Sequence, residues 1–134
     1  MILRKLFKNP KPTAWKILEK EVVDEMIFRT ENQRNRIMLE LMARGGMRVG
    51  EVLNLRPKDI EDRKTLIRSP KSGKEAEVVF IPQKVANRLK AYIRDNKIEA
   101  DQRIFPISYS AARAVVKKAG KLVGTNLRPH DLRR

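Results

Sequence analysis

The chain has 134 residues, enough for a single domain with a modest hydrophobic core. Its 31 Lys and Arg residues outnumber 16 Asp and Glu residues, and the formal net charge of +15 favours a polyanionic partner such as nucleic acid. The lack of cysteine and the single histidine exclude disulfides, thiolate metal sites and imidazole-based metal clusters.

Two features of the amino-terminal region bear on organisation and location. Residues 1–13 are expected to be a linker or an amino-terminal extension, because Pro10 and Pro12 favour an extended chain. No apolar run reaches the length of a membrane span, and the first residues lack the apolar core of a secretory signal. These features predict a cytoplasmic protein, associated with the nucleoid if it binds DNA.

Helices are expected through the first half of the chain. Apolar side chains at helical spacing predict a helix over residues 17–28. Asn32 or Thr30 is expected to cap the next helix, whose residues 37–42 are apolar on most of its circumference and belong in the centre of the core. Gly45-Gly46 is expected to end this helix, and a short helix over 49–55 and a turn over 56–59 are expected to follow.

A small antiparallel sheet is expected next, from two short strands over residues 64–68 and 76–81. The second strand alternates, which places Ala76, Val78 and Phe80 on one side. The turn-forming residues 69–74 join the two strands.

Two longer helices are expected in the carboxyl-terminal part. Pro82 opens the first, whose apolar stripe comprises Val85, Leu89, Tyr92 and Ile93. After an extended crossing over 104–107, Ser108 or Ser110 is expected to cap the second. Its apolar face comprises Ala112, Val115, Val116, Ala119 and Val123. The predicted fold class is therefore mostly α with a small antiparallel β-sheet (α+β).

The opposite face of that last helix carries Arg113, Lys117 and Lys121 at intervals of four residues. Such a stripe fits a solvated helix face and a row of phosphate contacts equally well.

Isolated basic residues in two segments suggest chemistry on a phosphoryl group. Arg48 stands between a glycine turn and an apolar helix. His130 and Arg133 are one helical turn apart, so their side chains can face the same point. Two guanidinium groups and an imidazole that converge would suit an anionic, transferring phosphoryl group.

Three segments resemble the motifs of the tyrosine recombinases (phage integrases) and follow the order of that family. Residues 43–55 resemble its first arginine box, residues 69–82 its lysine-bearing hairpin, and residues 127–134 its histidine-x-x-arginine box. The resemblance covers the chain from about Ile17 onward. It implies that residues 14–134 form a partial catalytic domain that lacks the carboxyl-terminal part.

The resemblance implies an enzyme that cuts and rejoins DNA without a metal or another cofactor. A tyrosine attacks the scissile phosphate, which gives a 3′-phosphotyrosyl link and a free 5′-hydroxyl. Arg48 and Arg133 would clamp the nonbridging oxygens, a role that needs guanidinium forks. Lys71 would protonate the leaving 5′-oxygen, with Lys74 as the competing assignment. His130 would assist proton transfer or hold a phosphate oxygen.

Other residues take supporting roles in this interpretation. Glu51 would lie behind Arg48 and fix its orientation. Lys74, Arg113, Lys117 and Lys121 would contact DNA. The implied partners are double-stranded DNA and further recombinase protomers in a tetrameric synapse.

The family's nucleophile lies downstream of the histidine-x-x-arginine box, so these 134 residues are expected to bind DNA but not to cleave it. Tyr92 is expected in the core, and Tyr109 at the start of a helix. The rival interpretations are a non-catalytic DNA-binding regulator or remnant, and a ribosomal or RNA-associated protein. The second rival is disfavoured because aromatic residues, which stack on bases, make up only 5% of the chain.

Overall fold

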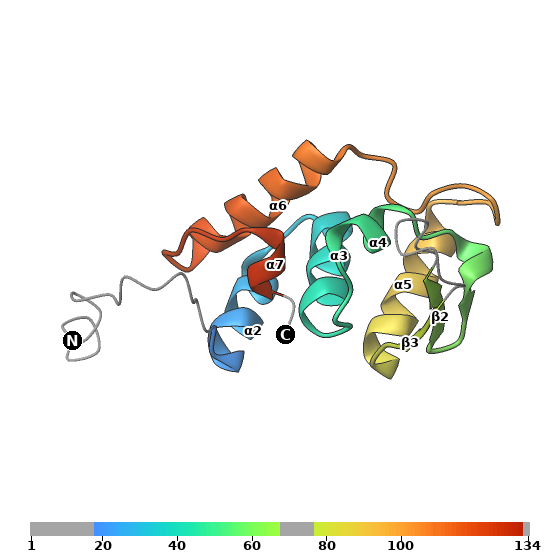
Figure 1. The fold of residues 1–134 in the computed structure, drawn as a ribbon, viewed down its shortest axis with the longest axis horizontal. Helices are drawn as coiled ribbons and strands as arrows, with labels where there is room; N and C mark the ends of the chain where they lie inside the picture. The colour runs from blue at the N-terminus through green and yellow to red at the C-terminus, as the bar shows by residue number, and fades with distance from the viewer. Residues whose placement is uncertain (1–17, 68–76, 133–134) are drawn as a thin grey trace.

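The computed structural model describes residues 18–67 and 77–132 of the chain. It is mostly helical with one small antiparallel sheet, as the sequence predicts (Figure 1). The described elements are α2 (Lys20–Arg29), α3 (Gln33–Ala43), α4 (Val49–Leu53), the 3-10 helix η1 (Pro57–Asp59), β1 (Ile60–Glu61), β2 (Lys64–Ile67), β3 (Glu77–Phe80), α5 (Gln83–Asp95), α6 (Tyr109–Leu122) and α7 (Pro129–Leu132).

Helix α3 is the centre of the fold. Residues 37–42 are all buried, and α2, α4, α5 and α7 pack around this helix. The helix begins where the Asn32 side chain accepts a hydrogen bond from the Asn35 backbone N–H at 3.0 Å. Asn32 is therefore the cap, whereas the Thr30 hydroxyl donates to the Met26 carbonyl at the end of α2. The predicted central helix is confirmed.

A tight turn leads from α3 into α4. The Gly46 backbone has a φ of +70°, which favours glycine. A Cβ on Gly45 would lie 2.6 Å from the Leu41 carbonyl oxygen, so the chain passes too close to α3 for any side chain there. The Met47 N–H donates to the same Leu41 oxygen at 3.1 Å, and the Met47 side chain is buried. The prediction that the helix ends at Gly45-Gly46 is confirmed, and the turn fixes where residue 48 emerges.

The sheet has the strand order β1-β2-β3, with both pairs antiparallel. β1 was not predicted, because two residues are too short to show an alternating pattern. The alternation in β3 is real, but Val78 and Phe80 lie on its exposed side, with 48% and 61% of their surface accessible. Val79 packs against the core instead, while Ala76 falls outside the described residues.

The two longer helices bury most of the predicted stripes, while Tyr92, Ile93 and Val123 are only partly buried. In α5 the buried residues include Val85 and Leu89, and Tyr92 stacks on Phe105 with ring centroids 5.8 Å apart. In α6 the Ser108 side chain accepts from the Ala111 N–H at 3.1 Å, which identifies Ser108 as the cap.

The chain after α6 folds back against that helix. A Cβ on Gly120 would lie 2.7 Å from the Thr125 carbonyl oxygen and 3.1 Å from Leu127 Cγ. This close approach lets the chain return so that α7 packs against α3 (Figure 1). None of the described helices combines the length and apolar character needed to cross a membrane.

Candidate active site

Arg48 is the residue that precedes α4, and it is exposed. Its backbone N–H donates to Glu51 Oε1 at 2.9 Å, which satisfies one of the free N–H groups at the helix start. Glu51 therefore fixes the main chain of Arg48. Its predicted part in orienting the guanidinium remains a prediction.

His130 lies on α7, with 68% of its side chain exposed. The next residue, Asp131, is buried and accepts a hydrogen bond from the Arg128 N–H at 2.9 Å. Its other carboxylate oxygen lies 3.5 Å from His130 Nε2. Sequence reasoning missed this role of Asp131, although the signal was present, since it follows Arg128 at the same spacing as Glu51 follows Arg48.

The two short helices that carry Arg48 and His130 both pack against α3. Each begins with a carboxylate that accepts a backbone N–H from three residues earlier. The structure therefore brings two of the predicted catalytic residues onto elements that flank one central helix. Lys71, Lys74 and Arg133 lie outside the described residues, so their predicted roles stay predictions.

Helix α6 displays the predicted basic stripe. Arg113, Lys117 and Lys121 are exposed, opposite the buried face of the helix. The Arg113 guanidinium lies 5.9 Å from the centre of the Tyr109 ring, and 53% of Tyr109 is exposed. The geometry fits phosphate contacts, and DNA binding by these residues remains a prediction.

Other arginines serve the fold, which the net charge did not reveal. Arg36 donates to the carbonyl oxygens of Ile27 and Phe28 at 3.1 and 2.8 Å, at the end of α2. Arg103 donates to Leu53 and Ile107 at 2.8 and 3.0 Å. Free carbonyls at helix ends need such donors. Some of the arginines that contribute to the net charge of +15 therefore bind the protein's own backbone carbonyls.

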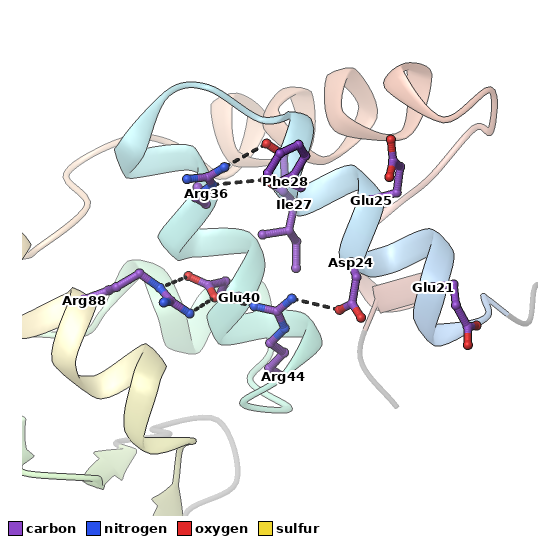
Figure 2. A pocket seen from close by; sticks show the side chains of 9 residues that line it. All are labelled: Glu21, Asp24, Glu25, Ile27, Phe28, Arg36, Glu40, Arg44 and Arg88. Atoms are coloured by element: carbon purple, nitrogen blue, oxygen red, sulfur yellow. Dashed lines mark hydrogen bonds and ion pairs between the residues drawn. The ribbon is translucent and has the colours of Figure 1, made fainter.

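A buried acid on α3 is the largest omission from the sequence-based predictions. Glu40, 1% exposed, accepts from Arg44 Nη1 at 2.5 Å, from Arg88 Nε at 2.9 Å and from Arg88 Nη2. The Glu40 carboxylate raises the pKa of Arg88 above its ordinary value, against the opposing effect of burial. The three side chains help to line a surface pocket of about 600 Å³ (Figure 2). The signal was an acid within an otherwise apolar run.

No three His, Asp or Glu side chains of residues 18–67 and 77–132 come close enough together to hold a metal ion.

Comparison with known proteins shows to which family the chain belongs. The profile of the phage integrase family matches residues 16–134. The chain belongs to the phage integrase family. The chain also resembles curated tyrosine recombinases, as its motifs predict.

Two of the relatives are considerably longer than this chain. Tyrosine recombinase XerA of Saccharolobus solfataricus is 29% identical over 120 residues, which cover 88% of this chain and 40% of the relative. Tyrosine recombinase XerA of Pyrococcus horikoshii is 30% identical over 138 residues, which cover 94% of this chain and 48% of the relative. The chain thus spans less than half the length of these relatives.

Solved structures show the same fold. A crystal structure of XerA recombinase superposes with a TM-score of 0.78 at 21% identity, and the match covers 92% of this chain and 49% of that structure's chain. The XerH site-specific recombinase, bound to its difH substrate in a pre-cleavage complex, gives 0.70 at 22% identity, with coverage of 87% and 40%.

Proposed function

We propose that this integrase chain takes part in site-specific recombination of double-stranded DNA through a 3′-phosphotyrosyl intermediate. The observation that carries the proposal is the pair of exposed motif residues, Arg48 and His130, on two short helices packed against α3. The family and the DNA-bound relative support it.

The proposed roles follow from the chemistry of each group. Arg48 and Arg133 bind the nonbridging oxygens as charge builds at phosphorus, because planar guanidinium groups can bind two oxygens at once. Lys71 protonates the leaving 5′-oxygen, and Lys74 is the alternative donor. His130 assists proton transfer or holds a phosphate oxygen.

Neither tyrosine of the 134 residues is proposed as the nucleophile. Tyr92 is half-buried and stacked on Phe105, so its ring is held in the core. Tyr109 begins α6, with the Arg113 guanidinium over its ring. The attacking tyrosine would come from polypeptide outside these residues, and the chain alone would bind DNA without cleaving it.

Binding to DNA is assigned to the basic face of α6, formed by Arg113, Lys117 and Lys121, together with Lys74. Phosphate contacts by such residues position a protein on the duplex and make binding sensitive to salt. Further protomers would assemble on the same DNA as a tetramer. A DNA substrate would place the protein in the cytoplasm, at the nucleoid.

The test joins residues 1–134 to the carboxyl-terminal segment of the P. horikoshii relative, which supplies a candidate nucleophile. The substrate is a pool of nicked duplexes with randomised sequence. The nick is included because loss of the short strand beside it traps a covalent adduct. We expect a protein–DNA adduct that forms in the presence of EDTA and that residues 1–134 alone do not form.

Two results would count against the recombinase proposal. If the extended protein binds duplex DNA but forms no adduct, the chain is better explained as a non-catalytic DNA-binding regulator. If EDTA abolishes cleavage, the reaction is that of a metal-dependent nuclease.

A further inference from the structure

The buried carboxylate of Glu40 joins α5 to the end of α3, and Arg44 extends the cluster to α2. Arg88 from α5 donates to both carboxylate oxygens, and Arg44 at the end of α3 donates to one of them. Arg44 Nη2 also lies 2.8 Å from Asp24 Oδ1 on α2. Figure 2 shows Arg44 and Arg88 reaching Glu40, and Asp24 on α2 facing Arg44.

The same residue also holds the backbone that follows α3. The Glu40 carbonyl oxygen accepts from the Arg44 N–H at 2.8 Å and from the Gly45 N–H at 3.1 Å. Both the backbone N–H and the guanidinium of Arg44 therefore donate hydrogen bonds to Glu40. Four residues later the chain reaches Arg48, across the turn in which Gly45 leaves no space for a side chain.

Only the acid of this cluster is buried, because the side chains of Arg88 and Arg44 keep 43% and 33% of their surface exposed. The cost of removing the Glu40 carboxylate from water still offsets its attraction to the arginines, so the pairing is a weak source of net stability. Its directional hydrogen bonds can nevertheless select one arrangement of the elements that it joins. Arg88 adds geometric definition here because it binds both carboxylate oxygens of one acid. Stability alone is therefore a poor explanation for this charge in an otherwise apolar stretch of α3.

The geometry points to Glu40 as a positioning residue for Arg48. Its carboxylate holds Arg44 and Arg88, which fixes the turn between α3 and α4 relative to α5. The Arg48 guanidinium then emerges at a defined place on the surface. This inference rests on the proposed role of Arg48 at the scissile phosphate, and it adds a residue that never touches DNA.

The first test uses the 134-residue chain and amide hydrogen exchange, which needs no DNA. Glu40→Gln keeps the shape but places an amide N–H₂ against arginine donors. We expect the amides of residues 45–52 to exchange at least about tenfold faster, while those of α6 stay within about twofold of the parent. Arg88→Met, which keeps the length of the apolar stem, should give the same local pattern and serves if Glu40→Gln fails to fold.

The matched control is Asp62→Asn. It removes another ion pair of α5, between Lys90 Nζ and Asp62 Oδ1 at 2.7 Å, which is exposed and does not reach α3. Asparagine also tolerates the φ of +55° found at this position. Exchange over residues 45–52 should be unchanged in this variant.

The second test measures cleavage by the extended protein described above. Glu40→Gln should lower the cleavage rate at saturating DNA by about tenfold and leave DNA affinity within about twofold, because a displaced Arg48 affects chiefly the transition state. If the parent extended protein forms no adduct, the recombinase proposal fails, and the exchange test still decides the role of Glu40. Unchanged exchange at 45–52, or equal acceleration over all helices, would overturn the positioning role.

Discussion

The Arg48 backbone N–H lies 2.9 Å from Glu51 Oε1, so the exposed arginine and the acid behind it are joined through the main chain. Arg128 and Asp131 are joined in the same way, also at 2.9 Å, at the start of the helix that carries His130. Both carboxylates therefore define where a short helix begins. A motif residue carried at such a start keeps its position even though its side chain is exposed.

The most specific prediction concerns the two arginines proposed to bind the scissile phosphate, Arg48 and Arg133. In the extended protein, Arg48→Lys and Arg133→Lys should leave DNA affinity nearly unchanged. The cleavage rate should fall by about a hundredfold or more, which corresponds to a barrier raised by on the order of 3 kcal/mol. The reason is that the guanidinium acts on charge that appears in the transition state. Single-turnover cleavage and fluorescence anisotropy measure the two quantities. Arg94→Lys, an exposed arginine on α5, is the control and should be fully active. Parental activity in Arg48→Lys would remove Arg48 from the proposed site.

Loss of the Glu51 cap should weaken the fold. Glu51→Ala leaves the Arg48 N–H without its carboxylate partner, and we expect the free energy of unfolding to fall by about 1 kcal/mol. Urea unfolding followed by circular dichroism measures the change. Glu61→Ala removes an exposed acid whose ion pair with Lys64 spans 3.9 Å, and it should change stability little. Equal effects of the two variants would show that the cap contributes nothing.

The basic face of α6 should govern the salt dependence of DNA binding. If Lys117 and Lys121 touch phosphates, each substitution to Ala should flatten the slope of log affinity against log salt by about one unit and weaken binding modestly. Anisotropy across a salt series measures the slope. Lys84→Ala, an exposed lysine on α5, should leave the slope unchanged. A slope that responds to Lys84 as strongly as to Lys117 would place the DNA on another face.

Substitution by alanine should change the stability of the protein in opposite directions at Gly46 and Gly50. Gly46 has open space around its Cβ position but a φ of +70°, so Gly46→Ala should destabilise the protein by about 1 kcal/mol. Gly50 lies within α4 with open space and no such φ, so Gly50→Ala should stabilise it by about 0.5 to 1 kcal/mol. Thermal unfolding of the two variants measures both effects. Stabilisation by Gly46→Ala would contradict the positive φ of the turn.

Acid should weaken the contact between α2 and the end of α3. Hydrogen bonds from Arg44, and then from Lys20, hold the pKa of Asp24 below its ordinary value. A lowered folded-state pKa contributes stability that is fully present above the unfolded value, about 3.9, and is lost as the pH falls through the folded value. Urea midpoints between pH 7 and pH 2 should therefore fall in the acid range, with a shallower fall in Asp24→Asn. An identical acid profile in that variant would show that Asp24 does not contribute.

Sequence patterns identified those parts of the fold whose signal is local. The helix around residues 37–42 and the stripe of α6 follow from spacing alone, and Asn32 and Ser108 were each among the expected caps. The pairing of Glu40 with Arg88 could not be predicted, because it joins residues 48 positions apart on different helices. For the same reason the sequence did not separate arginines that bind backbone carbonyls, such as Arg36 and Arg103, from those free to meet a partner.

Residues of the candidate site could be predicted from the sequence where they belong to short, continuous motifs. Short sequences predict Arg48 and His130 as site residues; the structure shows that both are exposed, and their roles remain predictions. The carboxylate of Asp131 was overlooked because a motif names the residues that act on substrate and ignores those that start the helix beneath them.

The close approach at Gly120 affects how mutations on α6 should be interpreted. This glycine lies on the same helix as Lys117 and Lys121, yet a side chain there would collide with the backbone of Thr125 and with Leu127. If Lys117 and Lys121 contact DNA, a genetic screen for defective alleles would recover substitutions at all three positions and group them as one surface. The allele at position 120 would instead displace the return of the chain toward α7, and its lowered unfolding temperature would distinguish it from the two lysine alleles.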